Sequence, residues 1–87
     1  MKVLIIEDEK PSARRLQRML EKLHVSVDKM LHNVQEAVEW FANNEHPDLI
    51  FLDIQLSDGL SFEIFDEVHV NSAIIFTTAF DEYALQA

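Results

Sequence analysis

Three acidic residues follow apolar runs, at places where a carboxylate can do chemistry. Glu7 and Asp8 come directly after Val3–Ile6, and Asp53 comes directly after residues 49–52. A buried carboxylate is costly unless a partner compensates its charge. Closely spaced carboxylates repel one another, and a hard dication with oxygen ligands such as Mg²⁺ is the natural compensation. We therefore expect Asp8 and Asp53, with Glu7 acting through water, to hold Mg²⁺.

Asp53 has a second role open to it, because a carboxylate beside Mg²⁺ can attack phosphorus and form an aspartyl-phosphate. Phosphoryl transfer depends mainly on positioning and charge neutralisation, which such a site supplies. Thr78 lies just past the apolar run that begins at Ala73, and its hydroxyl could hydrogen-bond a phosphoryl oxygen on Asp53. Taken alone, each acid is more simply a loop residue and Thr78 a turn or helix-cap residue. Their joint placement after three apolar runs is much more specific.

The composition indicates one small acidic domain. The chain has 87 residues, 48% of them hydrophobic, and a net charge of −9. That charge opposes binding to nucleic acid or anionic lipid, and it suits a protein that gathers cations. There is no cysteine, which fits a reducing cytoplasm. The apolar runs are too short to cross a membrane, so we expect neither membrane association nor direct nucleic-acid binding.

Hydrophobic patterning predicts alternating strands and helices. Strands are expected at 2–8, 25–31, 48–53 and 73–78, and helices at 11–23, 33–44, 60–68 and 81–87. Asn33 can cap the second helix, with Glu36 in capping-box spacing. Gly59, the single glycine, is expected in a turn with positive φ. The residues expected to face the core are Ala13, Leu16, Leu20 and Leu23 in the first helix, and Leu60, Ile64, Phe65 and Val68 in the third.

This alternation predicts an α/β fold, a doubly wound parallel sheet with helices on both faces. In the flavodoxin-like strand order 2-1-3-4-5, the first and third strands are neighbours at the switch point where ligands bind. Glu7, Asp8 and Asp53 would then converge in one cleft at the carboxyl ends of these strands.

The sequence also resembles the receiver domain of bacterial two-component response regulators. The resemblance covers the whole chain and rests on "LIIEDEKPSARRL", "PDLIFLDIQLSDGLSFEIF" and "IIFTTAFDEYALQA". The last segment is most similar to receivers joined to LytTR-type DNA-binding domains. The segment around Asp53 also has the family's spacing from the phosphoacceptor to Leu56.

The resemblance implies a role for each matching residue. Asp53 would accept a phosphoryl group from a sensor histidine kinase. Asp8 would ligate Mg²⁺, Glu7 would help through water, and the backbone carbonyl of Gln55 would be a third protein ligand. Thr78 would be the switch hydroxyl. The phosphorylated domain would control a DNA-binding output domain in a parent protein that regulates transcription.

The chain departs from the family pattern in two places. Ser57 stands where a proline is common. The sequence also ends within the fourth helix, so we expect residues 1–87 to be a receiver that is incomplete at its C-terminus. The fifth strand, its lysine and the fifth helix would be absent. Strand 73–78 would then be an open apolar edge, which favours a homodimer or an oligomer with exchanged elements.

Two other functions stay open beside the receiver interpretation, which predicts a non-enzymatic switch. One is a Mg²⁺-dependent phosphohydrolase that forms and breaks an aspartyl-phosphate. Gln55 disfavours it, because enzymes of the haloacid dehalogenase type carry a second acid at that position. The other is a receiver-like interaction domain that is not phosphorylated. Reaction with a small phosphodonor distinguishes the three, since a stable label, rapid turnover and no label are their respective outcomes.

Overall fold

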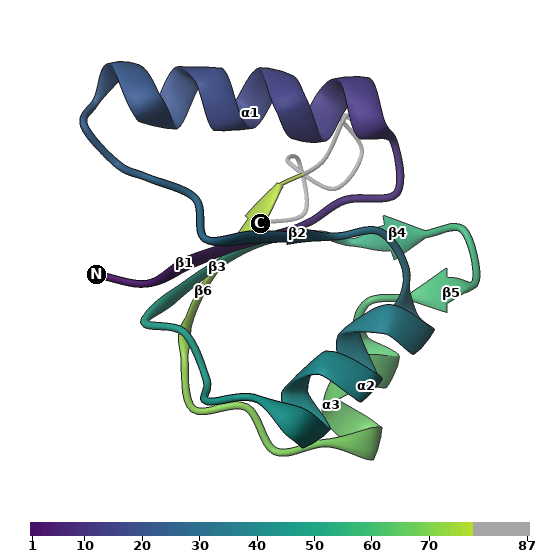
Figure 1. Cartoon of the computed structure of the whole chain (residues 1–87). Coiled ribbons are helices and arrows are strands. Elements are labelled where there is room, and N and C mark those ends of the chain that lie inside the picture. The colour runs from purple at the N-terminus through teal and green to yellow at the C-terminus, as the bar shows by residue number, and fades with distance from the viewer. Residues whose placement is uncertain (78–87) are drawn as a thin grey trace.

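A four-stranded parallel sheet forms the centre of the structure (Figure 1). The structure is a computed structural model, and it describes residues 1–77. Its order is β2-β1-β3-β6. This confirms the flavodoxin-like arrangement predicted for the first four strands of the sequence. Thr78 and the helix expected at 81–87 lie outside the described residues. The strands are β1 Val3–Ile6, β2 Lys29–Leu31, β3 Leu49–Asp53 and β6 Ala73–Thr77.

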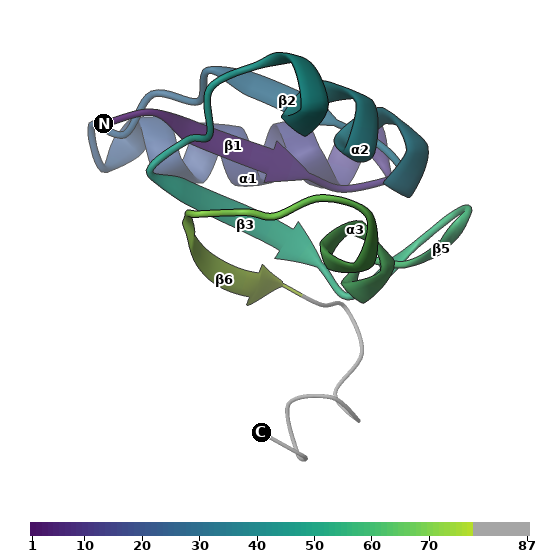
Figure 2. The same ribbon diagram turned by 90° about the horizontal axis from the view of Figure 1, so that it is seen from below.

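Helices cover both faces of this sheet, as Figures 1 and 2 show. Helix α1 (Lys10–Lys22) lies on one face, while α2 (Val34–Asn43) and α3 (Phe62–Glu67) lie together on the other. A short antiparallel hairpin, β4 (Gln55–Leu56) with β5 (Gly59–Leu60), follows β3 directly. Among residues 1–77, no helix has both the length and the apolar character needed to cross a membrane.

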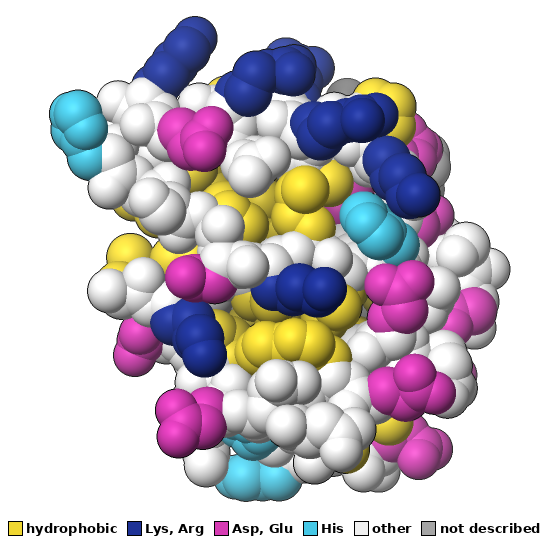
Figure 3. All heavy atoms as spheres, viewed as in Figure 1, with side chains coloured by type: hydrophobic (Ala, Val, Ile, Leu, Met, Phe, Trp, Pro, Cys, Tyr) yellow, Lys and Arg dark blue, Asp and Glu magenta, His cyan; other side chains and the backbone are white. Residues whose placement is uncertain are grey.

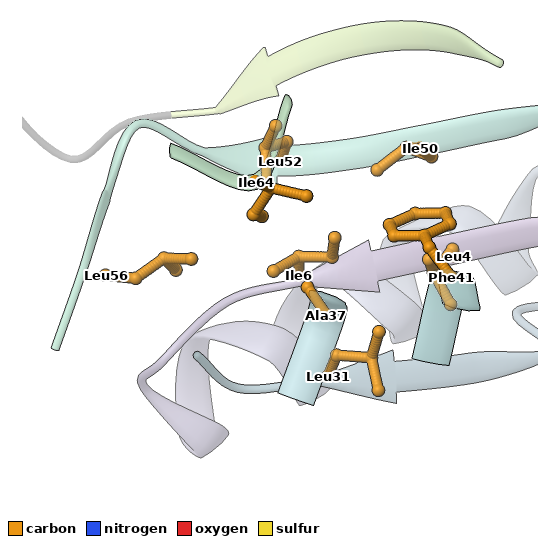
Figure 4. Packing of buried hydrophobic residues seen from close by; sticks show 9 residues of the cluster. All are labelled: Leu4, Ile6, Leu31, Ala37, Phe41, Ile50, Leu52, Leu56 and Ile64. Atoms are coloured by element: carbon orange, nitrogen blue, oxygen red, sulfur yellow. The ribbon is translucent and has the colours of Figure 1, made fainter. Parts of the chain in front are cut away.

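The core has two layers because side chains alternate along each buried strand. Leu4 and Ile6 of β1 pack toward α2 and α3 (Figure 4), whereas Ile5 packs toward α1. In β3, Leu52 joins the first layer and Phe51 the second. This double coverage explains why the strands are continuous apolar runs and not alternating ones.

Helix α1 ends in a reversal that hydrophobic spacing alone does not reveal. His24 adopts φ 63°, its N–H donates to the Glu21 carbonyl at 3.0 Å, and the Val25 N–H donates to the Leu20 carbonyl at 2.9 Å. This pattern is a Schellman motif. It turns the chain before Leu23 can reach the core, so the prediction that Leu23 faces inward is wrong, and the side chain is 71% exposed.

The other boundary errors have similar local causes. Strand β2 begins at Lys29, so only the last three residues of the predicted strand 25–31 pair in the sheet. Helix α3 begins at Phe62, two residues later than predicted, because Leu60 pairs with Gln55 in the hairpin. Leu60 is therefore exposed and does not face the core, whereas Ile64 is buried as predicted.

Candidate metal centre

The register between β1 and β3 brings the predicted acids together. Ile6 is paired with Leu52, so the next residues along the two strands are Glu7 and Asp53. The carboxylates of Glu7, Asp8 and Asp53 each offer an oxygen within 4.8 Å of the others. All three side chains are half-buried. The structure thus assembles the three carboxylates from two strands that are distant in sequence.

These carboxylates line a cleft at the carboxyl end of the sheet. Helix α1 contributes Ser12, and the segment after β3 contributes Gln55 and Ser57. Gln55, whose backbone carbonyl is the expected ligand, thus lines the cleft, and the residue is exposed. The full lining is Glu7, Asp8, Glu9, Ser12, Asp53, Gln55, Leu56 and Ser57.

Burial and the proximity of Asp8 raise the pKa of Glu7 and Asp53. Burial raises the pKa of Glu7 to about 8; the backbone N–H of Glu9 lowers it, and Asp8 and Asp53 add to the rise. Burial also raises the pKa of Asp53, which Asp8 reinforces, while Glu7 and the backbone N–H groups of Gln55 and Ile54 oppose it. The metal-free cleft thus resists holding three negative charges at once.

The donor set fits Mg²⁺. Carboxylates are hard oxygen ligands, and a dication would offset the burial and repulsion that raise the pKa of Glu7 and Asp53. Asp8 follows β1, Asp53 ends β3, and one oxygen of each lies within 4.8 Å of a Glu7 oxygen, so two direct carboxylates and a third through water can be accommodated. Among residues 1–77, Glu7, Asp8 and Asp53 form the one group of three or more acidic or histidine side chains that lie close enough together to share an ion.

Thr78 lies outside the described residues, but the strand leading to it is placed. Thr77, the last residue of β6, is paired with Asp53 at the end of β3.

Asp58 is a residue of this region that the sequence analysis did not single out. Its carboxylate accepts hydrogen bonds from the backbone N–H groups of Val34 at 2.7 Å and Gln35 at 3.0 Å. It thereby joins the segment after β3 to the first turn of α2. The sequence predicts a turn at Gly59, the residue after Asp58, and Gly59 adopts a positive φ of 150° as predicted. The hydrogen bond to Val34, 24 residues away, cannot be predicted from local sequence, because it depends on the packing of α2 and α3 on one face of the sheet.

Comparisons with known proteins agree with this architecture. Residues 3–87 match the family described as "Response regulator receiver domain". The chain is 41% identical to the "Sensory transduction protein LytT" of Bacillus anthracis and 36% identical to the "Transcriptional regulatory protein LytR" of Staphylococcus aureus strain N315. In both cases the whole chain is covered, and it spans 37% of the length of the relative.

A solved structure gives the same result. The N-terminal domain of a response regulator/sensory box/GGDEF 3-domain protein from Carboxydothermus hydrogenoformans superposes with a TM-score of 0.81 at 29% identity. The match covers 92% of this chain and 66% of that one.

The raised pKa of Glu7 predicts how stability varies with pH. A carboxyl group whose pKa rises on folding stabilises the folded state fully below its unfolded pKa, near 4.5, and loses that contribution as the pH rises through about 8. In EDTA, the melting temperature should therefore fall between pH 5 and pH 8. Glu7→Gln should flatten this fall and be more stable than the wild type at pH 8. Thermal unfolding followed by circular dichroism measures the effect.

The matched control is Glu45→Gln, which removes an exposed carboxylate that does not line the cleft. It should keep the wild-type slope. An unchanged slope in Glu7→Gln would show that Glu7 is not the group that responds to pH.

Proposed function

The chain belongs to the response regulator receiver domain family, and on that premise we propose that Asp53 is its phosphoacceptor, labelled by a sensor histidine kinase in the presence of Mg²⁺. The phosphoacceptor role is the function of this family. The observation that carries the assignment to Asp53 is its place at the carboxyl end of β3, within 4.8 Å of Glu7 and Asp8.

The roles of the chain's own residues follow from that geometry. An oxygen of Asp53 attacks the phosphorus, and the bond from phosphorus to the donor's leaving group breaks as the new bond forms. Asp8, Asp53 and the backbone carbonyl of Gln55 would hold Mg²⁺ directly, and Glu7 through water. When bound, Mg²⁺ neutralises charge on the transferring group. Thr78, which follows Thr77 in the sequence, would supply the hydroxyl that responds to phosphorylation.

The relatives support a proposal for the output. One is named a sensory transduction protein and another a transcriptional regulatory protein, and both are longer than this chain. We propose that the domain controls a DNA-binding output domain, acts in the cytoplasm and binds no nucleic acid itself. The net charge of −9 supports the last point.

We propose further that the domain is a switch and not a turnover enzyme. A phosphohydrolase that works through Asp53 needs an acid to deliver and remove protons, and position 55 carries an amide. A phosphoryl group on Asp53 should therefore persist long enough to accumulate. Rapid release of phosphate over many cycles in the labelling assay below would favour the phosphohydrolase.

Asp53→Asn should abolish phosphorylation. Incubation with acetyl phosphate and Mg²⁺ should add one phosphoryl group to the wild-type chain, measured by intact mass, and none to the variant. Asp48→Asn is the matched control, because Asp48 lies before β3 and accepts the Lys2 N–H at 2.7 Å, at the opposite end of the strand. Labelling should persist in this control. A label that peptide mapping places on Asp48 or Asp58 would refute the assignment.

Asp8→Asn should remove the response to Mg²⁺. The variant loses one ligand and one negative charge, so the rise in melting temperature that Mg²⁺ gives the wild type should disappear. Asp66→Asn removes the same charge from the exposed face of α3 and should keep the rise. If Asp8→Asn were stabilised by Mg²⁺ as the wild type is, the metal site would lie elsewhere.

Self-association of the chain stays a prediction. Strand β6 is one of the two edge strands of the sheet formed by residues 1–77, and it exposes Ile75 by 48% and Phe76 by 45%. An apolar strand edge is a template for pairing with a second chain. Light scattering at micromolar concentration should therefore show a dimer, and Ile75→Lys should shift it toward monomer. A monodisperse wild-type monomer contradicts the prediction.

A further inference from the structure

Asp58 is not near enough to the three acids to belong to their cluster, yet it holds the segment that completes the cleft. Its two carboxylate oxygens accept from two consecutive N–H groups of α2, those of Val34 and Gln35. The segment it belongs to begins immediately after Asp53 and supplies Gln55 and Ser57 to the cleft. We propose that Asp58 is a positioning residue for the metal centre, which fixes the backbone of Gln55 at the cleft by anchoring this segment to α2.

The segment is fastened at its base as well as at its tip. At the base, the N–H and the hydroxyl of Ser61 both donate to the Ile54 carbonyl, at 2.9 and 3.0 Å, and Ser61 is fully buried. The hairpin β4–β5 lies between these anchors, and Asp58 stands at its tip. Leu56 of the hairpin is also buried in the core cluster, so the freedom left to the hairpin lies at its exposed tip. The bonds from Asp58 to α2 remove this freedom.

A carboxylate suits the tip because the first turn of a helix presents unpaired N–H groups and a partial positive charge. The loss of hydration at this exposed residue opposes the charged form of Asp58, but the N–H groups of Val34 and Gln35 outweigh it and lower the pKa of Asp58 below its ordinary value. The anchor therefore stays charged at neutral pH.

Helix α2 does not depend on Asp58 to begin. Asn33 caps it from within, accepting the Glu36 N–H at 2.8 Å, and its carbonyl accepts the Ala37 N–H at 3.1 Å. The two caps serve the same helix but differ in what else they hold. Asn33 holds only α2, whereas Asp58 also holds the hairpin. This difference separates a positioning role from a purely structural one.

The inference rests on the proposed Mg²⁺ site, and it is tested by the Mg²⁺ affinity of the full chain. Asp58→Ala should weaken Mg²⁺ binding about tenfold, the usual lower limit for losing a residue that orients a metal site. Asn33→Ala should bind Mg²⁺ as the wild type does, although both variants lose a helix cap and melt at a lower temperature than the wild type. Titration calorimetry well below the melting temperatures measures the affinities.

Three further measurements sharpen the result. Asp58→Asn keeps one acceptor oxygen and should recover part of the affinity, while Asp66→Asn controls for the loss of one negative charge. In the metal-free protein, hydrogen exchange at the amides of residues 55–60 should be faster in Asp58→Ala than in Asn33→Ala. This exchange reports on the hairpin without any metal.

Equal Mg²⁺ affinity in the wild type and Asp58→Ala overturns this inference while leaving the proposed function standing. Equal weakening in Asp58→Ala and Asn33→Ala also overturns it, because the effect would then come from α2 alone. A wild-type chain that binds no Mg²⁺ overturns the proposed function and this inference together.

Discussion

The parallel pairing of β1 with β3 forces acidic side chains into one place, and the rest of the structure depends on that constraint. The strands are buried on both faces, so their register is fixed by the core, with Ile6 beside Leu52. Glu7 and Asp53 then meet where the strands end, whatever their mutual repulsion costs. Packing of the apolar core thus holds the acidic side chains in an arrangement that their burial and repulsion disfavour. The raised pKa of Glu7 reflects this opposition.

Acidic residues serve opposite purposes at the two ends of β1. At the amino end, Asp28 accepts the Val3 N–H and Asp48 accepts the Lys2 N–H, each at 2.7 Å. These carboxylates have backbone donors and tie neighbouring segments to the strand. At the carboxyl end, the backbone N–H groups beside Glu7 and Asp53 do not offset burial and repulsion, and both pKa values are raised. The carboxyl end is therefore where a cation gains most by binding.

The sequence predicted the parts of this structure that depend on residues close together in the chain. Continuous apolar runs identified β1 and β3, and the spacing from Asn33 to Glu36 identified the cap of α2. The general strand order of doubly wound sheets then predicted that β1 and β3 are neighbours. The hairpin and the anchoring by Asp58 were missed, because a two-residue strand has no detectable period and the partner of Asp58 lies 24 residues away. Such contacts follow from how helices pack, which local patterns do not encode.

The distribution of charge decides which kind of partner can balance the cleft. Five of the seven lysine and arginine residues lie in α1 (Lys10, Arg14, Arg15, Arg18 and Lys22), and Figure 3 shows such side chains gathered over that helix. Within the described part of the chain, the cleft lining contains no basic residue. Side chains of the described lining therefore leave the repulsion among its acids unrelieved, and a bound cation would relieve it. A small dication would do this through the oxygen ligands of the cleft.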